Sequence, residues 1–280
     1  MAKQSPRAPV RADWQPPAGK HADRFQLDEI DPAAMPWSCG DKSVDRQRVD
    51  ELALELDELQ NLFYADRRFG LLIVLQGMDA AGKDGTIRSV FARTSPLGVH
   101  SVAWKVPNEE EREHDFLWRI HRQAPRAGEI VVFNRSHYED VLVPVANRAI
   151  KPAALQQRYQ HINEFERMLC ENGTVLLKFM LHISRGEQRQ RLQARVDDPT
   201  KRWKFAAGDL EVRKKWTAYQ AAYQALLRAT STPWAPWTVV PADSKTHRNL
   251  MVASIIRDTL RSLKLRYPPD PPGLAGLKIT

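Results

Sequence analysis

The sequence has few cysteines and no long apolar run. Its 280 residues include two cysteines, Cys39 and Cys170, which lie far apart in the chain. So sparse a set excludes a disulfide scaffold and favours a reducing compartment. No apolar run approaches the roughly 18 residues of a membrane-spanning helix, and the polar N-terminus lacks the apolar segment of a secretory signal. We therefore expect a cytoplasmic protein that has no membrane partner.

Acidic residues are fewer than basic ones. The chain has 42 Lys and Arg against 34 Asp and Glu, which gives a formal net charge of +8. A basic surplus favours a polyanionic partner such as nucleic acid, an anionic membrane or a phosphate polymer. Many proteins are basic without such a partner, so the charge gains weight only beside a phosphate-binding motif.

A strand–loop–helix motif is the most informative feature that the sequence contains. An apolar run, Leu71–Leu75, is followed by a loop with a glycine near each end, Gly77–Lys83, and by a segment with helical character, Asp84–Arg93. Backbone N–H groups of such a loop and helix start point at a bound phosphate, and Lys83 adds a positive charge. A plain glycine-rich turn explains the glycines but leaves Lys83 unpaired. The motif therefore predicts phosphate binding.

Two carboxylates distinguish this loop from the usual pattern. The residue after Lys83 is normally a Ser or Thr that holds magnesium, and here it is Asp84. Asp79 lies inside the loop, where a carboxylate is unfavourable unless a cation separates it from the phosphate. We therefore predict Mg²⁺ as the cofactor and Asp79 as its ligand.

Strand-like and helical segments alternate along most of the chain. Strands are expected at 71–75, 99–104, 130–133, 174–183 and 237–240. Helices are expected at 44–67, 84–93, 108–123, 152–171 and 246–264. This alternation predicts the α/β class, with a five-stranded parallel sheet flanked by helices.

The segment 184–230 interrupts the alternation with two expected helices in succession, the second beginning near Asp209. It is rich in cations, which include Arg191, Arg195, Lys201 and Lys204. A cation-rich helix is often only a solvated surface. The place of this one, between the fourth and fifth strands, favours instead a helical lid that closes over a transferring phosphoryl group.

A polar run follows the third strand directly. Because ligands bind at the carboxyl ends of parallel strands, this run is expected beside the phosphate loop. Arg135 is predicted to clamp phosphate oxygens, and Asn134 stands where many phosphate-loop enzymes have an Asp. Two questions stay open: His137 is either a general base or a hydrogen-bonding residue, and Glu139 and Asp140 either begin a helix or bind metal.

Several motifs together resemble the polyphosphate kinase 2 family. They are GMDAAGKDGT at 77–86, FNRSHYEDV at 133–141, the lid stretch at 184–205 with DDPTKRWKF, and STPWAPWTVVPAD at 231–243. The resemblance covers about residues 45–265 and implies a phosphate-loop kinase fold. Many members have Asp where this chain has Asn134. The form with Asn resembles the subgroup that acts on both nucleoside mono- and diphosphates, and it shifts metal binding further onto Asp79.

The resemblance implies the reaction. Inorganic polyphosphate would donate a terminal phosphoryl group, reversibly and with Mg²⁺, to AMP or ADP, with guanine nucleotides as further candidate substrates. Asp79, Lys83 and Arg135 are the expected catalytic residues. The expected phosphate- and nucleotide-binding residues are Gly77, Ala80, Ala81, Gly82, Lys83, Asp84, Gly85, Thr86, Asn134, Arg135, Ser136, Arg191, Arg195, Lys201 and Lys204.

The expected organisation has three parts. An extended N-terminal arm at 1–43 wraps the domain or a partner subunit, a phosphate-loop kinase domain spans 44–266 with its lid at about 184–230, and a C-terminal tail follows at 267–280. The family usually forms homo-oligomers, which the arm allows. Two alternatives are an ATP-dependent nucleoside monophosphate kinase and a basic nucleic-acid-binding protein. The second lacks a recognition-helix, zinc-ligand or aromatic RNA-binding motif, so no specific nucleic acid is expected.

Overall fold

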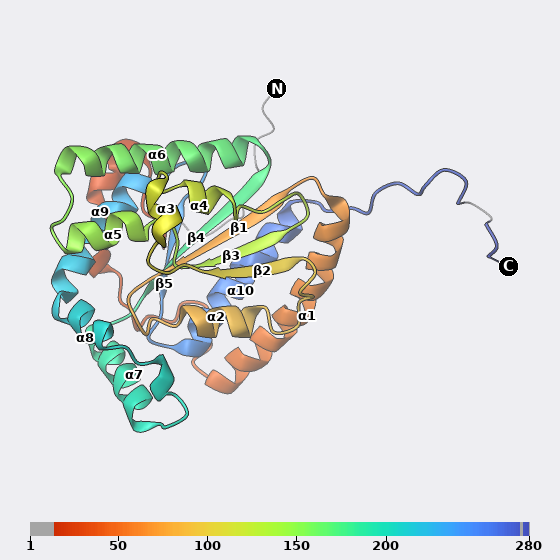
Figure 1. Cartoon of the computed structure of the whole chain (residues 1–280). Coiled ribbons are helices and arrows are strands. Elements are labelled where there is room, and N and C mark those ends of the chain that lie inside the picture. Colours follow the sequence, from red (N-terminus) through yellow and green to blue (C-terminus); the bar gives the residue numbers. More distant parts are fainter. Residues whose placement is uncertain (1–13, 275–276, 280) are drawn as a thin grey trace.

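The computed structural model describes residues 14–274 and 277–279. Its centre is one parallel sheet in the order β2-β3-β1-β4-β5 (Figure 1). The strands are β1 (Gly70–Gln76), β2 (Val99–Ala103), β3 (Ile130–Asn134), β4 (Thr174–His182) and β5 (Trp237–Pro241). Every residue of β1 is buried, because this strand lies between β3 and β4 and is covered on both faces. The predicted α/β class and five-stranded parallel sheet are confirmed.

Two layers of helices cover the sheet (Figure 1). One layer contains α1 (Lys42–Asp66), α2 (Lys83–Val90) and α10 (Lys245–Ser262). The other contains α5 (Glu139–Ala146), α6 (Pro152–Glu171) and α9 (Trp216–Thr230). Local signals set their ends: Asp41 accepts hydrogen bonds from the first turn of α1, Ser244 does the same for α10, and α6 begins with a proline. The site therefore rests on a scaffold buried on both sides.

One expected helix is divided in two. In place of a helix over 108–123, the structure has α3 (Glu109–Glu113) and α4 (Trp118–His121). Asn108 and Glu111 form the capping box that starts α3. The break follows because the Asp115 carboxylate accepts a hydrogen bond from the Leu117 amide at 2.9 Å, which gives the chain a turn of its own.

The insertion between β4 and β5 contains three helices rather than the two expected. They are α7 (Arg185–Asp197), α8 (Ala207–Lys214) and α9, and a 3-10 turn, η4 (Arg202–Lys204), separates the first two. Lys215 divides α8 from α9. The helices α7 and α8 extend away from the rest of the domain (Figure 1). The structure also decides one open question, because Glu139 begins α5.

The described part of the N-terminal arm lies along its own domain and includes two short 3-10 helices, η2 (Gly19–Arg24) and η3 (Leu27–Glu29). Ser231 donates to the Pro16 carbonyl at 2.9 Å, and Arg228 donates to the Phe25 carbonyl. Residues 1–13 of the expected arm and residues 275, 276 and 280 of the expected tail lie outside the described residues. Across the described ranges, no helix is both long and apolar enough to cross a membrane.

Candidate active site

The loop between β1 and α2 has a backbone conformation that depends on its glycines. Gly77 and Gly82 have φ angles of 148° and 108°. A side chain at Gly77 would also place its Cβ 2.6 Å from the Leu181 carbonyl oxygen. Ala80 has a left-handed φ of 63° although it carries a side chain, which costs about 1–2 kcal/mol. The loop is thus held in a shape that the local chain does not favour.

Lys83 is the first residue of α2, and its side chain is buried. The ammonium donates to the Gly77 carbonyl at 2.7 Å and to the Met78 carbonyl at 3.3 Å, so it lies over the start of the loop. Burial lowers the pKa of Lys83, and the nearby Arg135 guanidinium lowers it further. The predicted cation therefore lies at the loop, where a phosphate would compensate its charge.

Asp79 and Arg135 form an ion pair across the site. Arg135 Nη2 lies 2.7 Å from Asp79 Oδ1, and Arg135 Nη1 lies 3.7 Å from a Glu139 oxygen. Arg135 follows β3 with a left-handed φ of 65°, which turns the chain at the strand end. Burial raises the pKa of Glu139. Sequence reasoning found Asp79 and Arg135 but not their direct contact.

Other predicted residues occupy two kinds of position. Asn134 donates to the exposed Asp84 carboxylate at 2.6 Å, which places both at the mouth of the loop. Ser136 and Thr86 are buried. The side-chain amide of Gln76 is oriented so that its oxygen accepts from Ser136 and its nitrogen donates to Glu139. The Ser136 side chain contacts Gln76 at the end of β1 and the Tyr138 amide, and its binding role stays a prediction.

The lid cations differ in what they contact. Arg195 lies 3.5 Å from Asp209 of α8, and Lys201 lies 2.5 Å from Asp198. Lys204 packs on the Trp203 ring, with its nitrogen 4.9 Å from the ring centroid. These three remain near the surface and are not enclosed by the domain.

Arg191 has a different place from the other lid cations, because its guanidinium is buried against the back of the phosphate loop. Its Nη1 donates to the Ala80 and Ala81 carbonyls, and its Nη2 donates to the Ala242 and Asp243 carbonyls. The predicted direct contact with phosphate oxygens is therefore not made in this conformation.

A cavity of about 340 Å³ opens directly on the phosphate loop and Arg135. Its walls come from the start of the loop, α5 and the lid helices α8 and α9, and they include Val143, Asn147, Val212 and Tyr219. Burial raises the pKa of Tyr219, and Glu139 and Asp79 raise it further. Helices α8 and α9 thus form one side of a cavity that Arg135 also lines.

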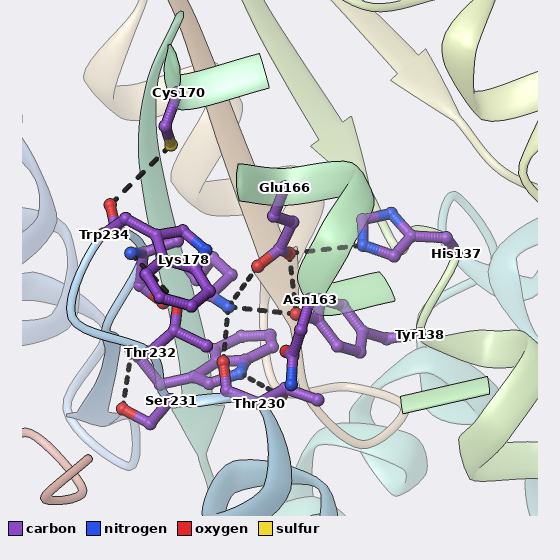
Figure 2. Close-up of polar contacts among 12 residues, drawn as sticks. His137, Tyr138, Asn163, Glu166, Cys170, Lys178, Thr230, Ser231, Thr232 and Trp234 are labelled. Atoms are coloured by element: carbon purple, nitrogen blue, oxygen red, sulfur yellow. Dashed lines mark hydrogen bonds and ion pairs between the residues drawn. The ribbon is translucent and has the colours of Figure 1, made fainter. Parts of the chain in front are cut away.

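A buried polar network anchors the turn that carries Arg135 (Figure 2). Lys178 of β4 donates to Glu166 at 2.6 Å, to the Tyr138 hydroxyl at 3.0 Å and to the Thr230 carbonyl at 2.7 Å. Tyr138 donates to Glu166 at 2.6 Å, and His137 Nε2 lies 3.3 Å from the same carboxylate. Because His137 is fully buried, it has the hydrogen-bonding role and not that of a general base.

A phosphate loop after the central strand, a parallel sheet of this order and a helical insertion before β5 together define a phosphate-loop kinase fold. The chain belongs to the polyphosphate kinase 2 (PPK2) family, whose model matches residues 40–268. The family resemblance read from the motifs is confirmed.

Named relatives are similar over most of the chain. The AMP/ADP-polyphosphate phosphotransferase of Meiothermus ruber is 51% identical over 245 residues, which is 88% of this chain and 92% of the relative. The ADP-polyphosphate phosphotransferase of Rhodopseudomonas palustris is 43% identical over 78% of this chain and 79% of its own length. The crystal structure of polyphosphate kinase 2 from Arthrobacter aurescens TC1 matches with a TM-score of 0.89 and 39% identity, and the match covers 98% of this chain and 95% of that one.

The oxygen ligands at the loop fit a divalent cation, which phosphotransferases generally use. No group of three or more His, Cys, Asp or Glu forms a complete metal site within the described part of the chain. Mg²⁺ needs only one or two carboxylates when phosphate and water supply its other ligands. The loop offers Asp79 within it and Asp84 in the first turn of α2, and the Asp84 carboxylate is exposed.

Proposed function

We propose that this protein transfers phosphoryl groups reversibly between inorganic polyphosphate and nucleotides, converting AMP to ADP and ADP to ATP. The observation that carries the proposal is the meeting of Lys83, Arg135 and Asp79 at one phosphate loop in a chain of the polyphosphate kinase 2 family. The net charge of +8 supports a reaction between two polyanions.

In the proposed reaction, a terminal phosphate oxygen of the nucleotide attacks the terminal phosphorus of the polyphosphate. A new P–O bond forms while the bond to the shortened polymer breaks, and the polymer keeps that bridging oxygen. Loop amides and Lys83 hold the phosphates, and Arg135 stabilises charge on the oxygens of the transferring group. The loose transition state needs positioning and charge more than a base, which agrees with the buried place of His137.

The proposed cofactor is Mg²⁺, with Asp79 as its principal protein ligand and Asp84 beside it. When bound, the ion would neutralise charge between the two phosphate chains. The Asp79 carboxylate would then contact both the ion and Arg135, whose Nη2 lies 2.7 Å from Asp79 Oδ1. Arg195, on the first lid helix, is proposed to contact the bound polymer, and Lys201 and Lys204 are proposed to reach it as the lid closes. A homo-oligomer and the use of guanine nucleotides remain predictions.

The test is phosphoryl transfer from polyphosphate to AMP and to ADP in parallel, with ATP as a competing donor. We expect ADP and ATP to form from polyphosphate in the presence of Mg²⁺ and not after its chelation. Preference for ATP as the donor to AMP, without any dependence on polyphosphate, would identify a nucleoside monophosphate kinase. Salt-sensitive retention of duplex or single strands without transfer would favour the nucleic-acid alternative.

A further inference from the structure

The backbone carbonyls of the phosphate loop are held by side chains from two other elements. For loop N–H groups to face a phosphate, the carbonyls must point away from it, where they need donors of their own. Gln188 of α7 donates to the Asp79 carbonyl at 3.0 Å. Arg191 of α7 donates to the Ala80 and Ala81 carbonyls, both at 3.0 Å. Three consecutive loop carbonyls are therefore held by one face of the first lid helix.

Arg248 of α10 reaches the same place from the other side. Its Nη1 donates to the Ala81 carbonyl at 3.0 Å, so this oxygen accepts from two guanidinium groups. The guanidinium also lies directly on Gly82, where a Cβ would be 1.9 Å from Nη1 and 2.6 Å from Cζ. Arg248 is buried, and within the described ranges it forms no ion pair with a carboxylate. Its Nε and Nη2 donate to the neighbouring Asn249 side chain, so the loop carbonyl and Asn249 hold the guanidinium without an acidic partner.

The hydrogen-bond capacity of Arg191 is fully used in this arrangement. An arginine has five N–H donors. Its Nε donates to Glu187 at 2.7 Å, and its Nη groups donate to four carbonyls, two in the loop and two, of Ala242 and Asp243, at the end of β5. A guanidinium with no free donor is suited to holding backbone and not to gripping a substrate.

We propose that Arg191 and Arg248 are positioning residues that brace the phosphate loop from behind, so that its amides stay aimed at the phosphoryl donor. The first lid helix is then a fixed support of the loop, and lid movement belongs to the segment beyond α7. Both cations contact the loop through its carbonyl oxygens. They therefore also add a positive electrostatic field at the donor without touching it. The strained left-handed Ala80 lies between the braced carbonyls and is the residue most in need of this support.

Amide exchange in the ligand-free protein tests the brace directly. We expect Arg191→Met and Arg248→Met each to speed hydrogen–deuterium exchange of the peptide over 77–86 by at least tenfold, while a peptide of α6 is unchanged. Arg191→Lys keeps the charge but has three N–H donors and cannot bond all four carbonyls that Arg191 holds, so its exchange in 77–86 should rise by at least fivefold. The proposal would be overturned if the peptide over 77–86 exchanged at the wild-type rate in these variants, or if exchange in the α6 peptide rose equally. The matched control is Arg189→Met, because Arg189 is an exposed cation on the same helix.

A kinetic arm rests on the proposed function, takes the phosphate loop as the site of the donor, and uses tripolyphosphate as the donor and ADP as the acceptor. Arg191→Met should raise KM for tripolyphosphate at least tenfold and KM for ADP less than threefold, and Arg189→Met should change neither by more than threefold. Equal effects on both KM values would count against a brace of the donor loop. If Arg191→Met does not fold, Gln188→Ala removes the donor to the Asp79 carbonyl together with the acceptor of Arg213, and it should speed exchange in 77–86 at least threefold. If the wild type shows no transfer, the proposed function fails while the exchange result still decides the brace.

Discussion

Arg135 Nη2 lies 2.7 Å from Asp79 Oδ1, so the loop carboxylate and the arginine after β3 meet directly. Neither side chain can therefore be altered without changing the other. We expect Asp79→Asn and Arg135→Met each to lower kcat/KM by ~10²–10³-fold, the range seen when one transition-state contact is removed.

Because they form a pair, the double variant should lose much less than the product of the two single losses. Steady-state assays of ATP formation from ADP and polyphosphate measure this coupling. Full activity in Asp79→Asn would refute the role of Asp79, and strictly multiplicative losses would show that the two residues act separately.

Gly82 is required both by its backbone angle and by its neighbour. Its φ of 108° suits glycine, and an added Cβ would lie 1.9 Å from Arg248 Nη1. We expect Gly82→Ala to lower the free energy of unfolding by about 1–3 kcal/mol, as measured by urea titration. Gly186→Ala is the matched control, because its nearest atom is 3.8 Å away, and it should cost nothing. A Gly82→Ala variant of wild-type stability would contradict the close approach of Arg248.

Lys178 and Glu166 form an ion pair in which both side chains are fully buried (Figure 2). Lys178→Met leaves the Glu166 carboxylate without its cation and should cost about 3–5 kcal/mol in the free energy of unfolding. The double variant Lys178→Met with Glu166→Gln should recover part of this loss, because no buried charge is left.

The exposed pair of Arg167 and Glu164 offers a control for these urea titrations. Arg167→Met should change the free energy of unfolding by no more than about 1 kcal/mol, because solvent screens an exposed pair. Equal losses in the free energy of unfolding for Lys178→Met and Arg167→Met would contradict the dependence on burial.

Glu139 should give the stability a distinct dependence on pH. Burial raises its pKa above the ordinary value of 4.5. The ordinary value applies to the unfolded state and the raised pKa to the folded state. Between these two pKa values the folded state binds more protons than the unfolded state, so stability falls as pH rises. Glu139→Gln should therefore be more stable than the wild type at neutral pH, and the difference should disappear as pH falls below 4.5.

Urea titrations at several pH values measure the effect of Glu139. Glu211→Gln is the control of opposite sign, because hydrogen bonding to Lys214 lowers the pKa of Glu211. A constant difference between Glu139→Gln and the wild type at all pH values would contradict the linkage.

The two thiols should differ in reactivity. Cys39 is exposed, whereas Cys170 is buried and burial raises its pKa to about 12. A thiol-reactive reagent at pH 8 should modify one cysteine in the native protein and two after denaturation in guanidinium chloride, because only the thiolate reacts. Rapid modification of both native thiols would contradict the packing of Cys170 beside the Trp234 carbonyl (Figure 2).

The prediction from sequence was most successful where the signal is local. The alternation of strands and helices and the phosphate loop depend on neighbours within a few positions. The division of the helix expected over 108–123 was missed because the turn at Asp115 breaks a segment whose composition is helical. The anchoring of His137 was undecided, because its partner Glu166 is supplied by another helix.

The sequence by itself determined the phosphate loop, the parallel sheet and which cations belong to the lid segment. Each of these features depends on contiguous residues with a defined period or spacing. Only the tertiary structure decided which of those cations are buried and which lie near the surface. Arg191 and Arg195 lie on the same lid helix, yet the first is buried against the loop carbonyls and the second pairs with Asp209. Arg248, distant in sequence, reaches the same carbonyl as Arg191. Burial and hydrogen-bond partners come from packing between distant segments, and no local pattern encodes them.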